Sequence, residues 1–186
     1  MTNRNLGEPP PVDNAMMRAL LACILALPFV AAAQAPSLPT CDGPEWKQFD
    51  FWVGDWDASY KAADGKVLNS RNKVSKILDG CVILEQFAGA PGTKLDGHSV
   101  STYDRNAKQW KQTWVDNTAS YLDFTGGFAD GKMVLARDAE RQGKKFRQRM
   151  VWQDIRAEAF KWLWQRSDDG GATWATQWEI DYRRAK

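Results

Sequence analysis

The sequence predicts an all-β protein built as an up-and-down antiparallel β-barrel of about ten strands. Short runs in which apolar and polar residues alternate follow one another from residue 50 onward. Asp-Gly dipeptides, which supply the positive φ values of tight hairpins, separate many of these runs. They begin at Asp64, Asp79, Asp96, Asp130 and Asp169. No capped stretch of helical periodicity intervenes, apart from a possible short turn around residues 45–49.

An up-and-down meander of this length must deal with its two edge strands. Closing the sheet into a barrel removes both edges, so closure is the economical solution. A two-layer sandwich is the alternative.

Composition narrows the class of protein. The chain has 186 residues, enough for one domain with a real core. Its 25 basic and 23 acidic residues nearly balance, so nucleic acid is not expected as a partner. The 10 Trp residues contrast with a single His, His98. One imidazole excludes a multi-His metal site and any Ser-His or Cys-His catalysis that does not use His98, and we expect no cofactor.

Residues 1–33 predict a leader. Residues 1–15 are polar and proline-rich, as in a disordered extension. Arg18, the apolar run 19–30 and the small residues up to Ala33 then form the three parts of a secretory signal peptide. The apolar run is shorter than the roughly 20 residues that span a bilayer, so no stable membrane span is expected. We expect cleavage after Ala33 and a periplasmic or secreted protein.

The cysteines raise two questions: whether Cys23 is lipidated, and whether Cys41 and Cys81 form a disulfide. Lipidation at Cys23 would make the chain a lipoprotein, but the apolar run before Cys23 is short for that signal. If Cys23 leaves with the leader, Cys41 and Cys81 remain as a pair in an oxidising compartment, where a disulfide persists. Such a bridge would tie the N-terminal segment, residues 34–48, to the barrel domain. Two buried free thiols are the other possibility.

The barrel domain is expected over residues 49–184. Its first strand contains an aromatic stretch in which Trp52, Gly54 and Trp56 share one face by period 2, so that Gly54 would lie between two indoles. The expected strands cover residues 50–62, 67–78, 82–88, 98–104, 109–116, 120–128, 132–138, 145–154, 158–167 and 174–183.

Four of these strands carry aromatic residues and scattered polar groups on one face. Such faces suit a cavity able to hold one small ligand, whereas a filled core usually carries more Leu, Ile and Val. The expected inward residues are Trp110, Gln112, Trp114 and Asp116 on one strand, Phe146, Gln148, Met150 and Trp152 on a second, Phe160, Trp162 and Trp164 on a third, and Trp174, Thr176, Trp178, Ile180 and Tyr182 on the last.

The run Gly54–Trp56 is similar to the Gly-x-Trp signature of lipocalin and calycin barrels. Together with it, the stretches FDFWVGDWD, ILDGCVILE, TYDRNAKQWKQTWVDN and SDDGGATW resemble a group of uncharacterised exported bacterial proteins with a lipocalin-like domain of unknown function. The resemblance covers residues 41–182. It implies a calycin-type barrel with a pocket and no agreed activity. It also implies that Arg183 or Arg184, on the last strand, lies over the ring of Trp56.

Charged residues on neighbouring strands form one candidate site. Glu85 and Asp116 could form a carboxylate pair with Arg147 and Arg149 opposite, since buried ionisable groups need partners. They would either pair as a structural network or orient the head group of a ligand lying on the aromatic walls. The full set of candidate ligand-binding residues is Trp56, Glu85, His98, Trp110, Trp114, Arg147, Arg149, Trp152 and Trp164.

His98 is also a candidate haem ligand, because a related set of calycin barrels binds haem through one His. In that set, the resemblance implies a ligand near the C-terminal strands, whereas His98 precedes a central strand. His98 shares its face with Val100 and Thr102. A hydrogen-bonded or rim histidine is therefore the favoured interpretation.

The leading hypothesis is a non-enzymatic binding protein for a small apolar or amphipathic molecule. An enzyme acting on a small periplasmic substrate is the second, and it predicts that Glu85 or Asp116 lies in a pocket with a raised pKa. An envelope-associated structural module with a filled barrel is the third. The sequence does not predict the oligomeric state.

Overall fold

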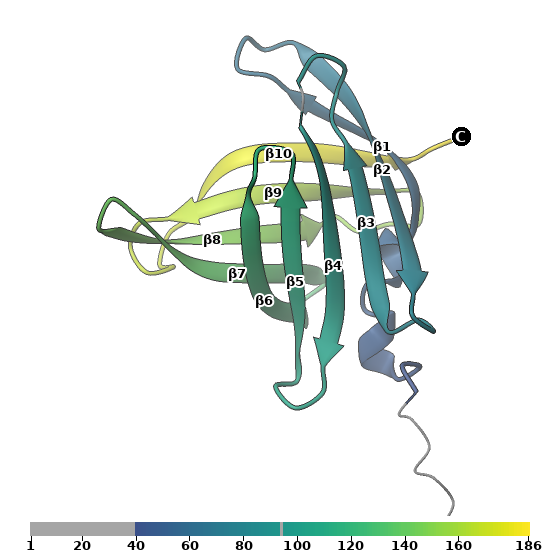
Figure 1. Ribbon diagram of the computed structural model, residues 1–186. Coiled ribbons are helices and arrows are strands. Elements are labelled where there is room, and N and C mark those ends of the chain that lie inside the picture. The colour runs from purple at the N-terminus through teal and green to yellow at the C-terminus, as the bar shows by residue number, and fades with distance from the viewer. Residues whose placement is uncertain (1–39, 94) are drawn as a thin grey trace, which may run out of the picture. The chain divides into compact units, whose positions relative to one another are not determined.

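The computed structural model describes residues 40–93 and 95–186. These residues form ten strands that close into an all-antiparallel, up-and-down barrel, as predicted (Figure 1). Two short 3-10 helices precede the barrel, η1 over Pro44–Lys47 and η2 over Asp50–Trp52. The strands are β1 Gly54–Lys61, β2 Val67–Ile77, β3 Val82–Ala88, β4 Asp96–Asp104, β5 Gln109–Asp116, β6 Tyr121–Ala129, β7 Lys132–Arg141, β8 Lys144–Gln153, β9 Ala159–Ser167 and β10 Ala175–Arg184.

The predicted leader, residues 1–33 with Cys23, lies outside the described residues. Within the part of the chain that is described, no helix is long and apolar enough to cross a membrane.

The first strand is the main departure from the predicted strand bounds. Residues 50–52 form η2 instead of extending β1, and the amide of Trp52 donates to the carbonyl of Phe49 over 2.9 Å. Trp52 therefore does not share a strand face with Trp56, and the prediction that Gly54 lies between two indoles was wrong. Gly54 has φ 137°, and a Cβ there would come within 2.0 Å of the Nη1 atom of Arg184. The glycine makes room for a guanidinium group.

One Asp-Gly pair also has a different role from the one predicted. The other four lie in connections between strands, but Asp96 and Gly97 begin β4. A Cβ on Gly97 would lie 2.1 Å from the Cζ2 atom of Trp114 on the neighbouring strand β5. Gly97 therefore allows the ring of Trp114 to lie directly against the β4 backbone. The role of this glycine is the close contact and not a tight turn.

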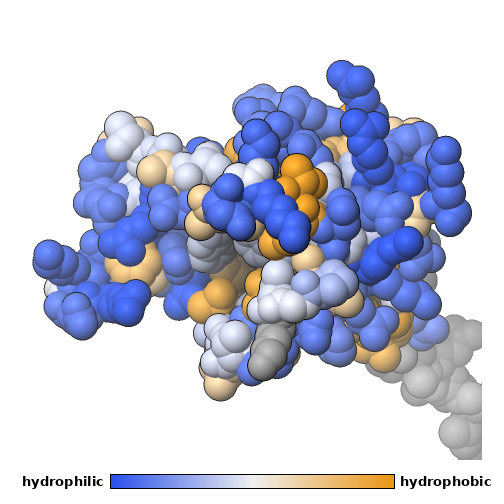
Figure 2. Space-filling model, turned by 90° about the horizontal axis from the view of Figure 1, so that it is seen from above, coloured by the Kyte–Doolittle hydropathy of each residue, from blue (hydrophilic) through white to orange (hydrophobic). Residues whose placement is uncertain are grey.

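Alternation along the strands separates an apolar interior from a polar exterior. The outer surface is mainly hydrophilic in the view from above (Figure 2). One end of the interior is closed by the chain that precedes β1. Phe49 and Trp52 are fully buried there and pack edge-on against Trp152, with ring centroids 5.4 and 5.2 Å away, and Phe49 also contacts Trp110 at 4.8 Å. We call these four residues the aromatic floor.

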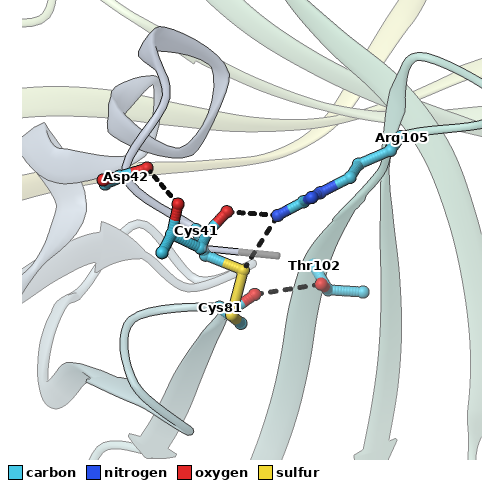
Figure 3. The surroundings of a disulfide bond; sticks show 6 residues. Cys41, Asp42, Cys81, Thr102 and Arg105 are labelled. Atoms are coloured by element: carbon cyan, nitrogen blue, oxygen red, sulfur yellow. Dashed lines mark hydrogen bonds between the residues drawn. A yellow bond between two sulfur atoms is a disulfide. The ribbon is translucent and has the colours of Figure 1, made fainter. Parts of the chain in front are cut away.

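A disulfide holds the segment that leads into the floor. Cys41 and Cys81 are bonded, as predicted, and the bridge joins this segment to the connection between β2 and β3 (Figure 3). Arg105, from the connection between β4 and β5, donates to the carbonyl of Thr40, and its guanidinium carbon lies 4.5 Å from the ring centroid of Trp46. Two connections at the same end of the barrel therefore position the floor.

The barrel closes where β1 pairs with β10, with Trp56 opposite Arg184. The guanidinium carbon of Arg184 lies 4.0 Å from the ring centroid of Trp56, and its Nη1 donates to the carbonyl of Val53 over 2.6 Å. Trp56 has no exposed surface, and its Nε1 donates to the carbonyl of Trp52 over 2.8 Å. Arg183, by contrast, is exposed. Arg184 is therefore the arginine that lies over the tryptophan and links the closing strands to η2.

Candidate binding site

The end of the barrel opposite the floor contains a cavity of about 200 Å³. Pale and orange side chains gather around a recess in the otherwise hydrophilic face that Figure 2 shows. Pockets for drug-sized ligands measure roughly 300–1,000 Å³, so this cavity suits a smaller molecule. Its lining comes from β3, β5, β6, β8, β9 and β10 and from the loop before β4, and consists of Glu85, Phe87, Leu95, Trp114, Asp116, Leu122, Phe124, Met150, Trp152, Trp162, Trp164, Trp178, Ile180 and Tyr182.

Six aromatic residues form a continuous chain of ring contacts along the cavity wall. Four of the five contacts are edge-to-face, with centroid separations of 5.6 to 6.4 Å, and the fifth, between Trp162 and Trp164, is stacked. Both geometries are favourable for aromatic pairs, so each ring helps to fix its neighbours. We call this set the aromatic belt: in order of contact, Trp114, Phe87, Trp178, Trp162, Trp164 and Phe124.

Glu85 is the buried polar group of the cavity. Its Oε1 accepts a hydrogen bond from the Nδ2 of Asn72 over 2.8 Å, and its Oε2 accepts one from the Oγ of Ser99 over 2.7 Å. Asn72 Nδ2 also lies 3.4 Å from the hydroxyl of Tyr182. Burial raises the pKa of Glu85 to about 7, although the hydrogen bonds from Ser99 and Asn72 act to lower it. Near neutral pH, this carboxyl is thus divided between its protonated and ionised forms.

Asp116 lines the same cavity but has a different electrostatic environment. Burial acts to raise its pKa, but hydrogen bonds from Thr118 and Trp114 outweigh burial, and the pKa is lowered. Its Oδ2 accepts from the Nε1 of Trp114 over 2.9 Å, and its Oδ1 accepts from the hydroxyl of Thr118 over 2.6 Å. Asp116 is therefore an ionised group that fixes the orientation of one belt tryptophan.

Arg147 and Arg149 do not lie opposite these carboxylates. They alternate along β8 with the inward residues Met150 and Trp152, so their side chains belong to the outer face. The Nε of Arg147 lies 3.0 Å from Asp138 Oδ1. The Nε of Arg149 donates to Gln165 Oε1 over 2.7 Å, and its guanidinium lies over the ring of Trp174. Neither arginine lines the cavity.

The remaining candidates divide between the cavity and other parts of the barrel. Trp114, Trp152 and Trp164 line the cavity together with Glu85. Trp110 belongs to the floor alone, Trp56 to the closing strand pair, and His98 is exposed on the outer face of β4. Among residues 40–93 and 95–186, no group of three His, Cys, Asp or Glu side chains could hold a metal ion.

Sequence reasoning missed several residues of the site. Phe87 and Phe124 line the cavity, and Asn72 and Ser99 hold the carboxyl of Glu85. Phe87 could have been found, because it shares the face of Glu85 by period 2. Asn72 and Ser99 depend on the register of β2 and β4 against β3, which the sequence does not reveal.

The raised pKa of Glu85 predicts a pH dependence of stability. Between the ordinary pKa of 4.5 and the folded pKa of about 7, the folded state binds the proton more tightly than the unfolded state. The free energy of unfolding should therefore fall as pH rises across this window, by about 3 kcal/mol at about 1.4 kcal/mol per pKa unit. Urea denaturation at about pH 5 and about pH 8 measures the change.

Glu85→Gln is the matched variant, because its amide oxygen can still accept from Asn72, its NH2 group can donate to the Ser99 hydroxyl, and it does not ionise. We expect it to lose this fall in stability between the two pH values. Asp116 and Asp169 have lowered pKa values, so their ionisation affects the free energy of unfolding only in more acidic solution. They should not contribute to the change between about pH 5 and about pH 8. The same pH dependence in wild type and variant would contradict the assignment.

A comparison with protein-family models matches residues 42–184 to the family described as "Protein of unknown function (DUF1579)". The matched range runs from the residue after Cys41 to the last residue of β10, so it contains the floor, the belt and Glu85. The comparison with curated proteins found no match.

Proposed function

The chain belongs to the DUF1579 family, whose description names no activity, and we propose from its geometry that it binds one small apolar or amphipathic molecule in the barrel. The observation that carries the proposal is the cavity of about 200 Å³, which has the aromatic belt as its wall and one buried carboxyl, Glu85. The rings bury the body of the ligand, and Glu85 fixes its polar group. The contacts between the belt rings keep the wall in place before binding, which reduces the ordering that binding requires.

The calycin type of the barrel and the export of the chain are parts of the same proposal. Arg184 over Trp56, with Gly54 two residues before the ring, supports the calycin relationship, because this is the arrangement that the resemblance implies. The disulfide between Cys41 and Cys81 supports an oxidising compartment, where such bonds persist.

Native mass spectrometry of protein purified from its host tests the binding function. We expect a co-bound small molecule in the wild type and its loss in Leu122→Trp, because the larger side chain fills part of the cavity that Leu122 lines. Val100→Trp, on the exposed outer face of β4, is the matched control and should keep the bound mass. Retention of the molecule in Leu122→Trp, with both variants folded by circular dichroism, would contradict a site in this cavity.

An enzyme that uses Glu85 is the second candidate, favoured by the pKa of about 7, which suits a general acid or base at neutral pH. Asp116, with its lowered pKa, is less suited to that role. The two functions differ in the fate of the bound molecule. A binding protein releases the molecule unchanged. An enzyme converts the molecule to a product, and we expect this conversion to stop in Glu85→Gln while the molecule still binds.

A further inference from the structure

The charged side chains that line the cavity, among the residues that the structure describes, are all acidic. Among the described residues that line it, Glu85 and Asp116 carry the carboxyl groups, and none is Lys, Arg or His. Both hydrogen-bond donors to Glu85, Asn72 and Ser99, are neutral, so they orient the carboxyl without cancelling its charge. An ionised carboxylate has about four acceptor positions, and the described residues use two of those of Glu85. A cationic ligand would balance the negative charge of the Glu85 carboxylate, whereas an anionic ligand would be repelled by it.

The aromatic belt adds a second attraction for positive charge. Aromatic faces attract cations that lie within roughly 6 Å of the ring centroid, and cages of such rings recognise alkylated ammonium groups. The belt already has one such contact: the guanidinium carbon of Arg137, on β7, lies 5.8 Å from the ring centroid of Phe124. Arg137 does not line the cavity. This contact shows that a belt ring can accept a cation.

We infer that the cavity binds a small organic cation, with an alkylated ammonium group held by the aromatic belt and Glu85 as its counter-charge. This inference rests on the proposed binding function and names the chemical class of its ligand. The cavity volume of about 200 Å³ admits a compact ammonium compound and is small for a long-chain lipid.

The inference links binding to protonation of Glu85. The groups that surround Glu85 are Asn72 on β2, Ser99 on β4 and the buried hydroxyl of Tyr182 on β10, and Asp116 on β5 lines the same cavity. A bound cation stabilises the carboxylate and lowers the pKa of Glu85 from about 7. Binding at neutral pH therefore releases a proton, and the affinity should rise with pH through this region. An uncharged ligand brings no charge to stabilise the carboxylate, and its affinity should not rise.

Three molecules of nearly the same shape test the inference by isothermal titration calorimetry. Choline is the cation, 3,3-dimethylbutan-1-ol is its uncharged carbon isostere, and 3,3-dimethylbutanoate is a matched anion. At about pH 8, we expect choline to bind at least about 10-fold more tightly than the alcohol, and the anion to bind most weakly. Choline affinity should fall at about pH 6.

Glu85→Gln should reduce choline affinity about 10-fold and abolish its pH dependence, while leaving the affinity for the alcohol nearly unchanged. Glu158→Gln is the matched control, because it removes the same charge from an exposed residue outside the cavity and should leave choline binding unchanged.

The outcomes separate the inference from the proposed function. If the alcohol or the anion binds as tightly as choline, or if Glu85→Gln binds choline as well as the wild type, the cation inference is overturned and the binding function stands. If none of the three molecules binds to folded protein, the cation inference is overturned, and the co-bound mass with its loss in Leu122→Trp decides the binding function separately.

Discussion

Replacing Trp56 with alanine is expected to lower the free energy of unfolding by about 4 kcal/mol, within the range for truncating a buried tryptophan. Trp56 is completely buried, and its ring packs edge-on against Phe160 at 4.8 Å. Its loss also removes the surface on which Arg184 lies and the hydrogen bond to the carbonyl of Trp52. Urea denaturation followed by far-UV circular dichroism measures the effect.

Tyr121→Ala is the control for this prediction. Tyr121 is also an aromatic residue on a strand, but 64% of its surface is exposed, so its truncation should change stability by no more than about 0.5 kcal/mol. If Trp56→Ala were as mild as the control, the closing strand pair would not depend on the contacts described here.

Removing the disulfide is expected to destabilise the protein by about 4 kcal/mol. The bridge joins residues 40 positions apart, and the loop-closure entropy of the unfolded chain gives this magnitude for a loop of that length. The double variant Cys41→Ser with Cys81→Ser avoids an unpaired thiol and isolates the effect. Denaturation midpoints of the variant and of the wild type provide the measurement.

A reductant supplies the control for the double variant. Adding it should lower the denaturation midpoint of the wild type towards that of the variant, and it should leave the variant unchanged. Equal stability of oxidised and reduced wild type would mean that the segment before η1 is held by its noncovalent contacts alone, among them Arg105 on Trp46.

Most of the barrel could be predicted because its signals are local. Alternation and turn residues act within a few positions, and β3 and β5 begin and end at the predicted residues. The break between η2 and β1 could not be predicted in this way. The aromatic pattern of residues 49–60 continues through it, and only contacts with Trp110 and Trp152, far away in the sequence, make Phe49 and Trp52 part of the floor.

Individual residues of the site could be predicted from the sequence, but the contacts between them could not. Glu85 and Trp114 were identified from the pattern of their own strands, and both line the cavity. Arg147 and Arg149 were proposed as partners although they alternate with the inward residues of their strand, and period 2 alone places them outside. The groups that do hold Glu85 come from β2 and β4, and strand register is set by the closed sheet as a whole.

The pairing of β1 with β10 has a consequence for the newly made chain. During synthesis, strands β1 to β9 can pair only with their neighbours in sequence, and the sheet keeps two open edges until residues 175–184 emerge. Such edges invite pairing with other chains. We therefore expect a chain truncated before residue 175 to self-associate. The final ten-residue strand protects the protein from aggregation, because it covers both open edges.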